Sequence, residues 1–147
     1  MRNLLKSIFD TNTGDRRIDI GLLILRLGVG SFMLSAHGWG KLTSFAEKAD
    51  TWADPIGLGP TVSLSLAIFA EFFCSLAVIL GAGTRAAAIP LLITMLVAAG
   101  IVHADDPWSK KEFALLYGWV FATFIFVGAG RFSIDSMISK GLAQSGK

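Results

Sequence analysis

Long runs of apolar residues set the strongest limit on what this chain can fold into. A helix needs about 20 apolar residues to cross the hydrocarbon core of a bilayer. Inside lipid, only helices and closed barrels satisfy the backbone polar groups. Four such runs occur, at residues 18–37, 62–80, 86–102 and 113–127. The sequence therefore predicts an all-α integral membrane protein with four transmembrane helices, the last two near the lower length limit.

The composition leaves little room for a soluble domain. Of the 147 residues, 53% are hydrophobic and 16% are charged, whereas soluble domains carry about 25% charged residues. The net charge is only +2 and the basic residues are spread along the chain, so nucleic-acid binding is not expected. The single cysteine, Cys74, excludes an intrachain disulfide and a site built from several thiolates.

Basic residues divide unevenly between the two sides that the four spans define. Eight flank one side, namely Arg2, Lys6, Arg16, Arg17, Arg85, Arg131, Lys140 and Lys147, and four flank the other, namely Lys41, Lys48, Lys110 and Lys111. Because cytoplasmic loops carry an excess of Lys and Arg, both termini are expected in the cytoplasm. The predicted fold is an antiparallel four-helix transmembrane bundle, with residues 1–17 as a cytoplasmic N-terminal segment, 18–136 as the transmembrane domain and 137–147 as a cytoplasmic tail.

One connection, residues 38–61, is long and contains recurrent aromatic residues. Phe45, Ala49 and Trp52 follow one another at helical spacing. This pattern predicts a short amphipathic helix on the outer membrane surface, ended by Asp54 and Pro55.

Two charged residues lie inside predicted spans, where each costs roughly 2.5 to 3.5 kcal/mol on insertion scales. At a rise of about 1.5 Å per residue, Arg26 is about 12 Å and Glu71 about 14 Å from the cytoplasmic ends of their spans. We therefore predict a buried Arg26–Glu71 pair. It either holds the first two helices in register, or forms a site in which Arg26 binds a carbonyl or carboxylate and Glu71 relays a proton.

Four polar residues are expected together at the outer surface: His37, Lys41, His103 and Glu112. Two histidines in one leaflet are able to ligate a metal or haem, but nothing in their spacing sets the two rings at coordinating distance. No metal site is predicted and haem is not favoured. His37 and Lys41 are interpreted as groups that accept a proton or orient a substrate.

Four motifs follow one another along the chain in a distinctive order. They are LRLGVG at residues 25–30, HGWGKL at 37–42, Glu71 followed by LGAGTR at 80–85, and GAGRFSID at 128–135. With these motifs the chain resembles the DoxX family over residues 20–136. The resemblance implies a small four-helix, multi-pass protein of the inner (plasma) membrane. Members are linked to quinone-coupled sulfur oxidation, redox stress defence and membrane oxidoreductase complexes.

The family's recurrent positions match Arg26, His37, Lys41, Glu71, Arg85, Glu112 and Asp135. The predicted roles are catalytic for Glu71 and His37 and substrate-binding for Arg26, Lys41 and Glu112. Arg85 and Asp135 are expected to cap cytoplasmic helix ends or to contact lipid head groups.

The leading functional hypothesis is a membrane component of a redox system that binds a quinone or similar apolar small molecule near Arg26 and Glu71. Electrons would come from a partner oxidoreductase, because the sequence has no flavin, iron–sulfur or nicotinamide motif. The alternative is a non-enzymatic scaffold or small-molecule carrier whose outer loop recruits a partner. Transport would require a homo-oligomer, since four short helices enclose little space.

Overall fold

The computed structural model describes residues 11 and 13–144, and the regular elements in this part are all helices. Three helical runs are long and apolar enough to cross a membrane: Arg16–Thr43, Pro60–Leu80 and Thr84–Val102. They contain the first three predicted spans. Most of the predicted N-terminal segment, with Arg2 and Lys6, and the terminal Lys147 lie outside the described residues.

Each of the three runs contains one π-helical segment. The first consists of α2 (Arg16–Met33), η1 (Leu34–Gly38) and α3 (Trp39–Thr43), the second of α5 (Pro60–Ile68), η2 (Phe69–Cys74) and α6 (Ser75–Leu80), and the third of α7 (Thr84–Val97) and η3 (Ala98–Val102). In a π segment the backbone bonds span five residues, as where His103 N–H donates to Ala98 O at 2.9 Å. Such segments occur frequently at functional sites.

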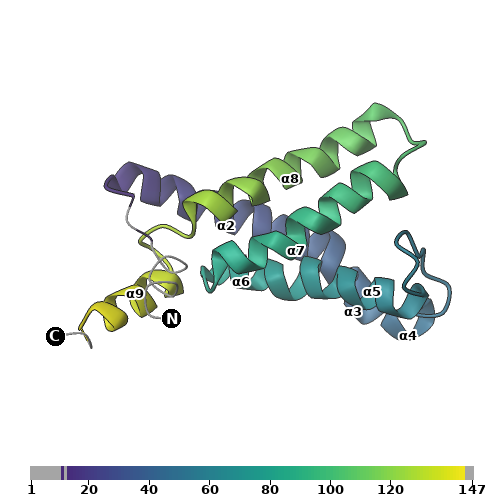
Figure 1. The fold of residues 1–147 in the computed structure, drawn as a ribbon, viewed down its shortest axis with the longest axis horizontal. Coiled ribbons are helices and arrows are strands. Elements are labelled where there is room, and N and C mark those ends of the chain that lie inside the picture. Colours follow the sequence, from purple (N-terminus) through teal and green to yellow (C-terminus); the bar gives the residue numbers. More distant parts are fainter. Residues whose placement is uncertain (1–10, 12, 145–147) are drawn as a thin grey trace.

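A fourth long helix, α8 (Trp108–Val127), lies alongside α7 (Figure 1). It contains the fourth predicted span, residues 113–127. It is not among the three helices above because Lys110, Lys111 and Glu112 lie near its start. Helix α8 is nevertheless packed against the rest of the protein, because the buried rings of Phe121 and Phe124 belong to the hydrophobic core.

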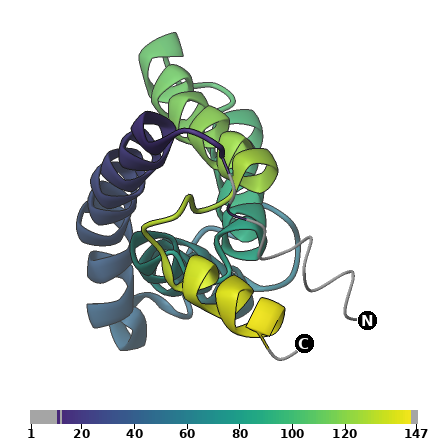
Figure 2. The same cartoon turned by 90° about the vertical axis from the view of Figure 1, so that its left-hand side faces the viewer.

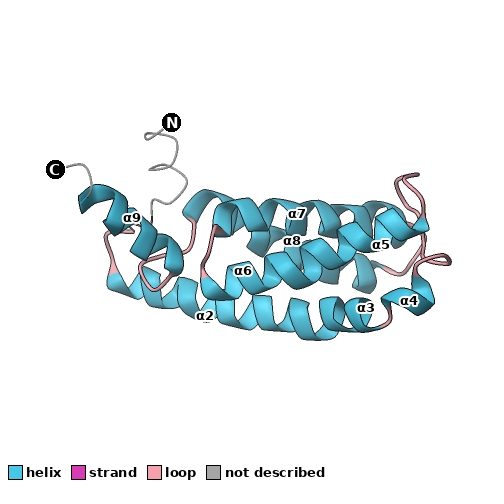
Figure 3. Cartoon of the chain, turned by 90° about the horizontal axis from the view of Figure 1, so that it is seen from below, coloured by secondary structure: helices cyan, strands magenta, loops and turns pink. Residues whose placement is uncertain are grey.

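The long helices run side by side between two ends of the molecule (Figure 3). We call one the α4 end, where α3, the short α4 (Phe45–Lys48) and the α7–α8 connection lie. The other is the α9 end, where α2 begins and α9 (Ile134–Gln144) lies across the helices (Figure 2). Most of the predicted C-terminal tail is therefore helical.

Glycines determine how the second run ends and how closely it meets the first. Gly81 has a left-handed backbone (φ 69°), and the bonds Ala82 N to Ala77 O and Gly81 N to Val78 O form the Schellman motif that terminates α6. At Gly38 an added Cβ would lie 2.5 Å from Glu71 O. Helices approach this closely in membranes where small residues allow it, so Gly38 places the α4 end of the first run directly against Glu71.

The long connection between the first two runs differs from its prediction. The expected helix over Phe45 to Trp52 is a single turn, α4, which ends at Lys48. The carboxylate of Asp54 organises the remaining chain, because it accepts hydrogen bonds from Leu58 N (3.0 Å) and Gly59 N (2.8 Å). Those bonds hold the turn that leads into α5, so the chain after Lys48 is ordered by the Asp54 side chain and not by a longer α4.

Candidate functional site

The most buried ion pair in the part of the chain described joins Lys41 and Glu71 near the α4 end. Lys41 Nζ donates to Glu71 Oε2, and the two side chains are only 17% and 6% exposed. Lys41 also lies over the ring of Trp52, 5.7 Å from its centroid, a distance at which a cation is attracted to the face of the ring. Because the two charges are opposite, the buried pair is neutral as a unit. The ammonium of Lys41 has three N–H donors and Glu71 accepts from one of them, so not all of its donors are used by Glu71.

The predicted pairing of Arg26 with Glu71 is wrong. Arg26 is fully buried and its guanidinium donates to three carbonyls, Val78 O (3.1 Å), Ile79 O (3.0 Å) and Phe132 O (2.6 Å). It thus caps the end of α6 and ties it to the chain before α9. The mutual depth was misjudged because the two runs are offset along their axes. Gly38 lies against Glu71, so residues 16–37 of the first run but only 72–80 of the second lie on the α9 side of this contact. The start of the first run therefore projects beyond the end of α6.

His37 lies in η1, next to Gly38, and its ring faces α8. The ring centroid is 6.0 Å from that of Tyr117, in an edge-on arrangement, and 6.3 Å from that of Phe113. Glu71 and Lys41 are close enough to act on it electrostatically. Glu112, by contrast, is exposed on α8, and its carboxylate makes no hydrogen bond or ion pair with another described residue.

An apolar cavity of about 510 Å³ opens beside the Lys41–Glu71 pair, between the second and third runs. Its polar lining groups belong to Lys41, Trp52, Ser63, Thr94 and His103. Cavities of several hundred Å³ with apolar walls and a few polar groups are typical of small-molecule sites. Of the predicted catalytic and substrate-binding residues, only Lys41 lines this cavity, and Glu71 takes part through its pair with Lys41.

Sequence reasoning missed Ser63, Thr94 and Pro90 as lining residues. Pro90 was a usable signal, because a proline inside a span removes one backbone donor and interrupts the helical bonding. Thr94 Oγ1 donates to Pro90 O at 2.9 Å, one turn away. This is the ordinary back-bond of a helical threonine to the carbonyl four residues earlier, whereas the carbonyl that Pro90 leaves without its helical donor is that of Ala86.

His103 lines the cavity at its α4 end and pairs with Asp106 in the loop that follows. Its Nδ1 lies 2.7 Å from Asp106 Oδ2, and Lys110 Nζ lies 3.3 Å from the same oxygen. The hydrogen bond from His103 is the main cause that lowers the pKa of Asp106, and the bond from Lys110 adds to it. No three His, Cys, Asp or Glu side chains gather as around a metal ion in residues 13–144.

Asp135 and Arg85 join helix ends at the opposite, α9 end. The Asp135 carboxylate accepts from Gly83 N (2.6 Å) and Thr84 N (3.0 Å), which are free donors at the start of α7. Arg85 donates to Phe126 O (3.3 Å) and Val127 O (3.4 Å) at the end of α8. These bonds connect α7, α8 and α9.

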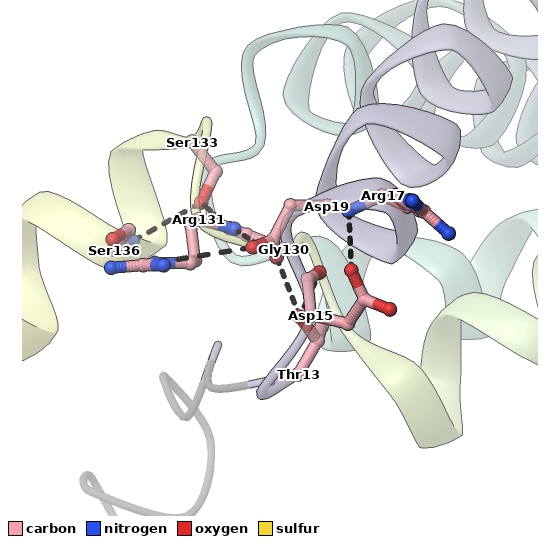
Figure 4. Close-up of polar contacts among 8 residues, drawn as sticks. All are labelled: Thr13, Asp15, Arg17, Asp19, Gly130, Arg131, Ser133 and Ser136. Carbon is pink, nitrogen blue, oxygen red and sulfur yellow. Dashed lines mark hydrogen bonds and ion pairs between the residues drawn. The ribbon is translucent and has the colours of Figure 1, made fainter.

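Asp19 forms a second buried carboxylate centre at the α9 end (Figure 4). It is fully buried, and its Oδ1 accepts from Arg131 N (3.0 Å) and Thr13 Oγ1 (2.9 Å). Its Oδ2 faces Arg131 Nε at 3.9 Å. The motif at residues 128–135 is therefore hydrogen-bonded through Arg131 to Asp19 at the start of α2. Within the motif, Ser133 Oγ accepts a hydrogen bond from Ser136 N at 3.2 Å, in the first turn of α9.

Comparison with known proteins decides the family. A profile of the DoxX family matches residues 21–104, more than half of the chain, and this stretch contains Lys41, Glu71 and His103. The chain belongs to the DoxX family. No solved structure is significantly similar to it.

Curated relatives of this DoxX protein match along most of its length. An uncharacterized protein of Haemophilus influenzae is 30% identical over 82% of this chain and 85% of its own. The inner membrane protein YqjF of Escherichia coli is 27% identical over 83% and 95%, and an uncharacterized membrane protein of Mycobacterium tuberculosis is 28% identical over 88% and 83%. With three membrane-spanning helical runs, the DoxX protein is a multi-pass inner-membrane protein, as the sequence predicted.

Proposed function

We propose that this DoxX protein is the membrane component of a redox system and binds a quinone or a similar apolar small molecule. The observation that carries the proposal is the apolar cavity of about 510 Å³ with Lys41 on its wall, paired with the buried Glu71. The proposed site lies near Glu71, as the sequence suggested. Arg26 is not part of this site, because its guanidinium donates to three carbonyls at the α9 end.

The chemistry of the pair suits a neutral ligand with a carbonyl head. The ammonium of Lys41 has three donors, of which Glu71 takes one. A second is available to a quinone oxygen, and because Glu71 balances the charge, an anionic head is not required. Reduction of a quinone to a quinol takes up two electrons and two protons. A partner oxidoreductase supplies the electrons, and Glu71 and His37 are the proposed proton-transfer groups.

For the topology we propose that α8 is a fourth crossing, which completes an antiparallel four-helix bundle over residues 18–136 with both termini cytoplasmic. Packing of α8 along α7 and the buried Phe121 and Phe124 support the fourth crossing. The orientation is supported by Arg16, Arg17 and Lys140, which are all exposed at the α9 end.

A scaffold role is the second candidate, and one observation favours it. Ile56 and Leu58 are about half exposed, at 46% and 54%, in a turn that the bonds of Asp54 hold in place. An ordered loop with exposed apolar tips is a suitable docking element for a periplasmic protein partner. Because Ile56 also lines the cavity, Leu58 is the position that separates the two roles. In that case, Leu58→Asp would abolish partner capture while leaving small-molecule binding intact.

Filling the cavity tests the proposed function directly. Ala67 lines the cavity, whereas Ala86 is exposed on α7 and does not. Ala67→Leu is expected to weaken the binding of a fluorescent quinone analogue by the full-length protein in nanodiscs at least tenfold, and Ala86→Leu is expected to bind normally. Equal binding by both folded variants would contradict the proposed location of the site.

A further inference from the structure

Helix α9 leaves three of its apolar residues exposed. Met137 is 72% exposed, and Ile134 and Ile138 are 37% and 38% exposed. The residues that α9 buries are polar, Asp135 and Ser136, at 2% and 3% exposure. A surface helix of a soluble protein shows the reverse, with its apolar stripe against the core.

The exposed residues share one face of the helix. At about 100° per residue, Ile134, Met137 and Ile138 fall within a sector of about 100°. Ala143 lies on the opposite face, and Lys140 flanks the apolar sector. The sequence of α9 is therefore amphipathic, and the described residues leave its apolar side partly uncovered, most of all at Met137.

Hydrogen bonds prevent α9 from turning this face inward. Asp135 N donates to Gly81 O at 2.8 Å, and the Asp135 carboxylate accepts from Gly83 N and Thr84 N. These bonds fix the first turn of α9 to the α6–α7 turn. Rotation of the helix about its axis would break all three bonds, so the outward direction of the apolar face is a built feature.

Basic side chains surround α9 at the same end of the molecule. The side chain of Arg131, just before the helix, is 60% exposed, and Lys140 on the helix is exposed as well. Arg16 and Arg17 are exposed at the start of α2, which lies at this end (Figure 1). Phe126, near the end of α8, is 81% exposed.

We propose that α9 is an interfacial helix that lies in the surface of the bilayer and binds anionic phospholipid. Ile134, Met137 and Ile138 enter the boundary of the acyl chains, while Lys140 and Arg131 contact the negatively charged head groups. An amphipathic helix with basic flanks binds membrane surfaces in this way. The inference is independent of any ligand in the cavity.

Site-directed spin labelling tests the proposal on the full-length protein. Cys74 is the only cysteine, so a Cys74→Ala background accepts single labels at Met137→Cys and, as the matched control, Ala143→Cys. The protein is reconstituted in phosphatidylcholine vesicles with or without phosphatidylglycerol. Collision rates with oxygen, which concentrates in the acyl region, and with a water-soluble nickel chelate then report the depth of each label.

The expected result is opposite behaviour at the two positions. The label at 137 should favour oxygen over the nickel chelate several-fold, and the label at 143 should do the reverse. Phosphatidylglycerol should deepen the label at 137, and Lys140→Glu should remove that effect. Equal exposure of both labels to the chelate would overturn the proposal. Protection of position 137 with spin–spin broadening would also overturn it, because a second copy of the chain would then cover this face.

Discussion

Gly38→Ala is expected to separate the first two helical runs at the height of the Lys41–Glu71 pair. An added Cβ would lie 2.5 Å from Glu71 O, 2.7 Å from Glu71 C and 2.8 Å from Phe72 N. Because non-bonded atoms are optimally about 3.5 to 4 Å apart, the backbones must move apart by about 1 Å. Both sides of the contact are backbone, so no side-chain rotation relieves it, and overpacking of this kind costs about 1 to 3 kcal/mol.

Gly40→Ala is the matched control in the same helix. No atom lies within 4 Å of a Cβ at this position, and replacing glycine by alanine in a helix favours the helix by about 0.5 to 1 kcal/mol. We therefore expect the two substitutions to change the free energy of unfolding in opposite directions. Titration of the purified proteins from mild detergent into sodium dodecyl sulfate, followed by circular dichroism, measures that free energy. Equal stabilities, or a Gly38→Ala protein as stable as wild type, would refute the close backbone contact.

Three further predictions concern polar groups. Lys41→Met leaves Glu71 buried without its partner and should destabilise the protein by about 3 to 5 kcal/mol; adding Glu71→Leu should restore most of this loss in the same titration, and additive losses would argue against the pair. Asp135→Asn should cost about 1 to 3 kcal/mol, because two backbone donors lose a charged acceptor, and should speed hydrogen exchange at the start of α7; unchanged exchange would contradict the cap. Bonds from Ser63, Gly59 and Leu58 lower the pKa of Asp54, so this carboxylate stabilises the fold above its ordinary pKa and loses that effect as the pH falls through the lowered value. Ser63→Ala should raise the Asp54 pKa towards normal in a carboxyl NMR titration, and an unmoved pKa would exclude that bond as the main cause.

Hydropathy predicted the spans because the cost of exposing polar groups to lipid acts on each segment separately. The first three predicted runs lie inside Arg16–Thr43, Pro60–Leu80 and Thr84–Val102. The sequence alone also indicated that Glu71 has a buried partner, since a charge inside a membrane span requires one.

The identity of that partner could not be predicted in the same way. Depth counted along each span places Arg26 and Glu71 at one level only if the helix ends are level. The ends are not level, because the contact of Gly38 with Glu71 offsets the first run from the second. Lys41 was assigned to the outer surface, yet Gly38 brings its helix against Glu71. Contacts between helices depend on such close approaches, which leave no periodic signal. The π segments η1 and η2, which contain His37 and Glu71, have none either.

Mass spectrometry of the small molecules that co-purify with the protein is the most direct test of the proposed site. The wild type and Glu71→Gln would be extracted in mild detergent, with circular dichroism to establish that both are folded. The account predicts a quinone or similar neutral lipophilic molecule at close to one per wild-type chain, and its loss from folded Glu71→Gln. A folded wild type that carries no such molecule and binds no added quinone would contradict the account.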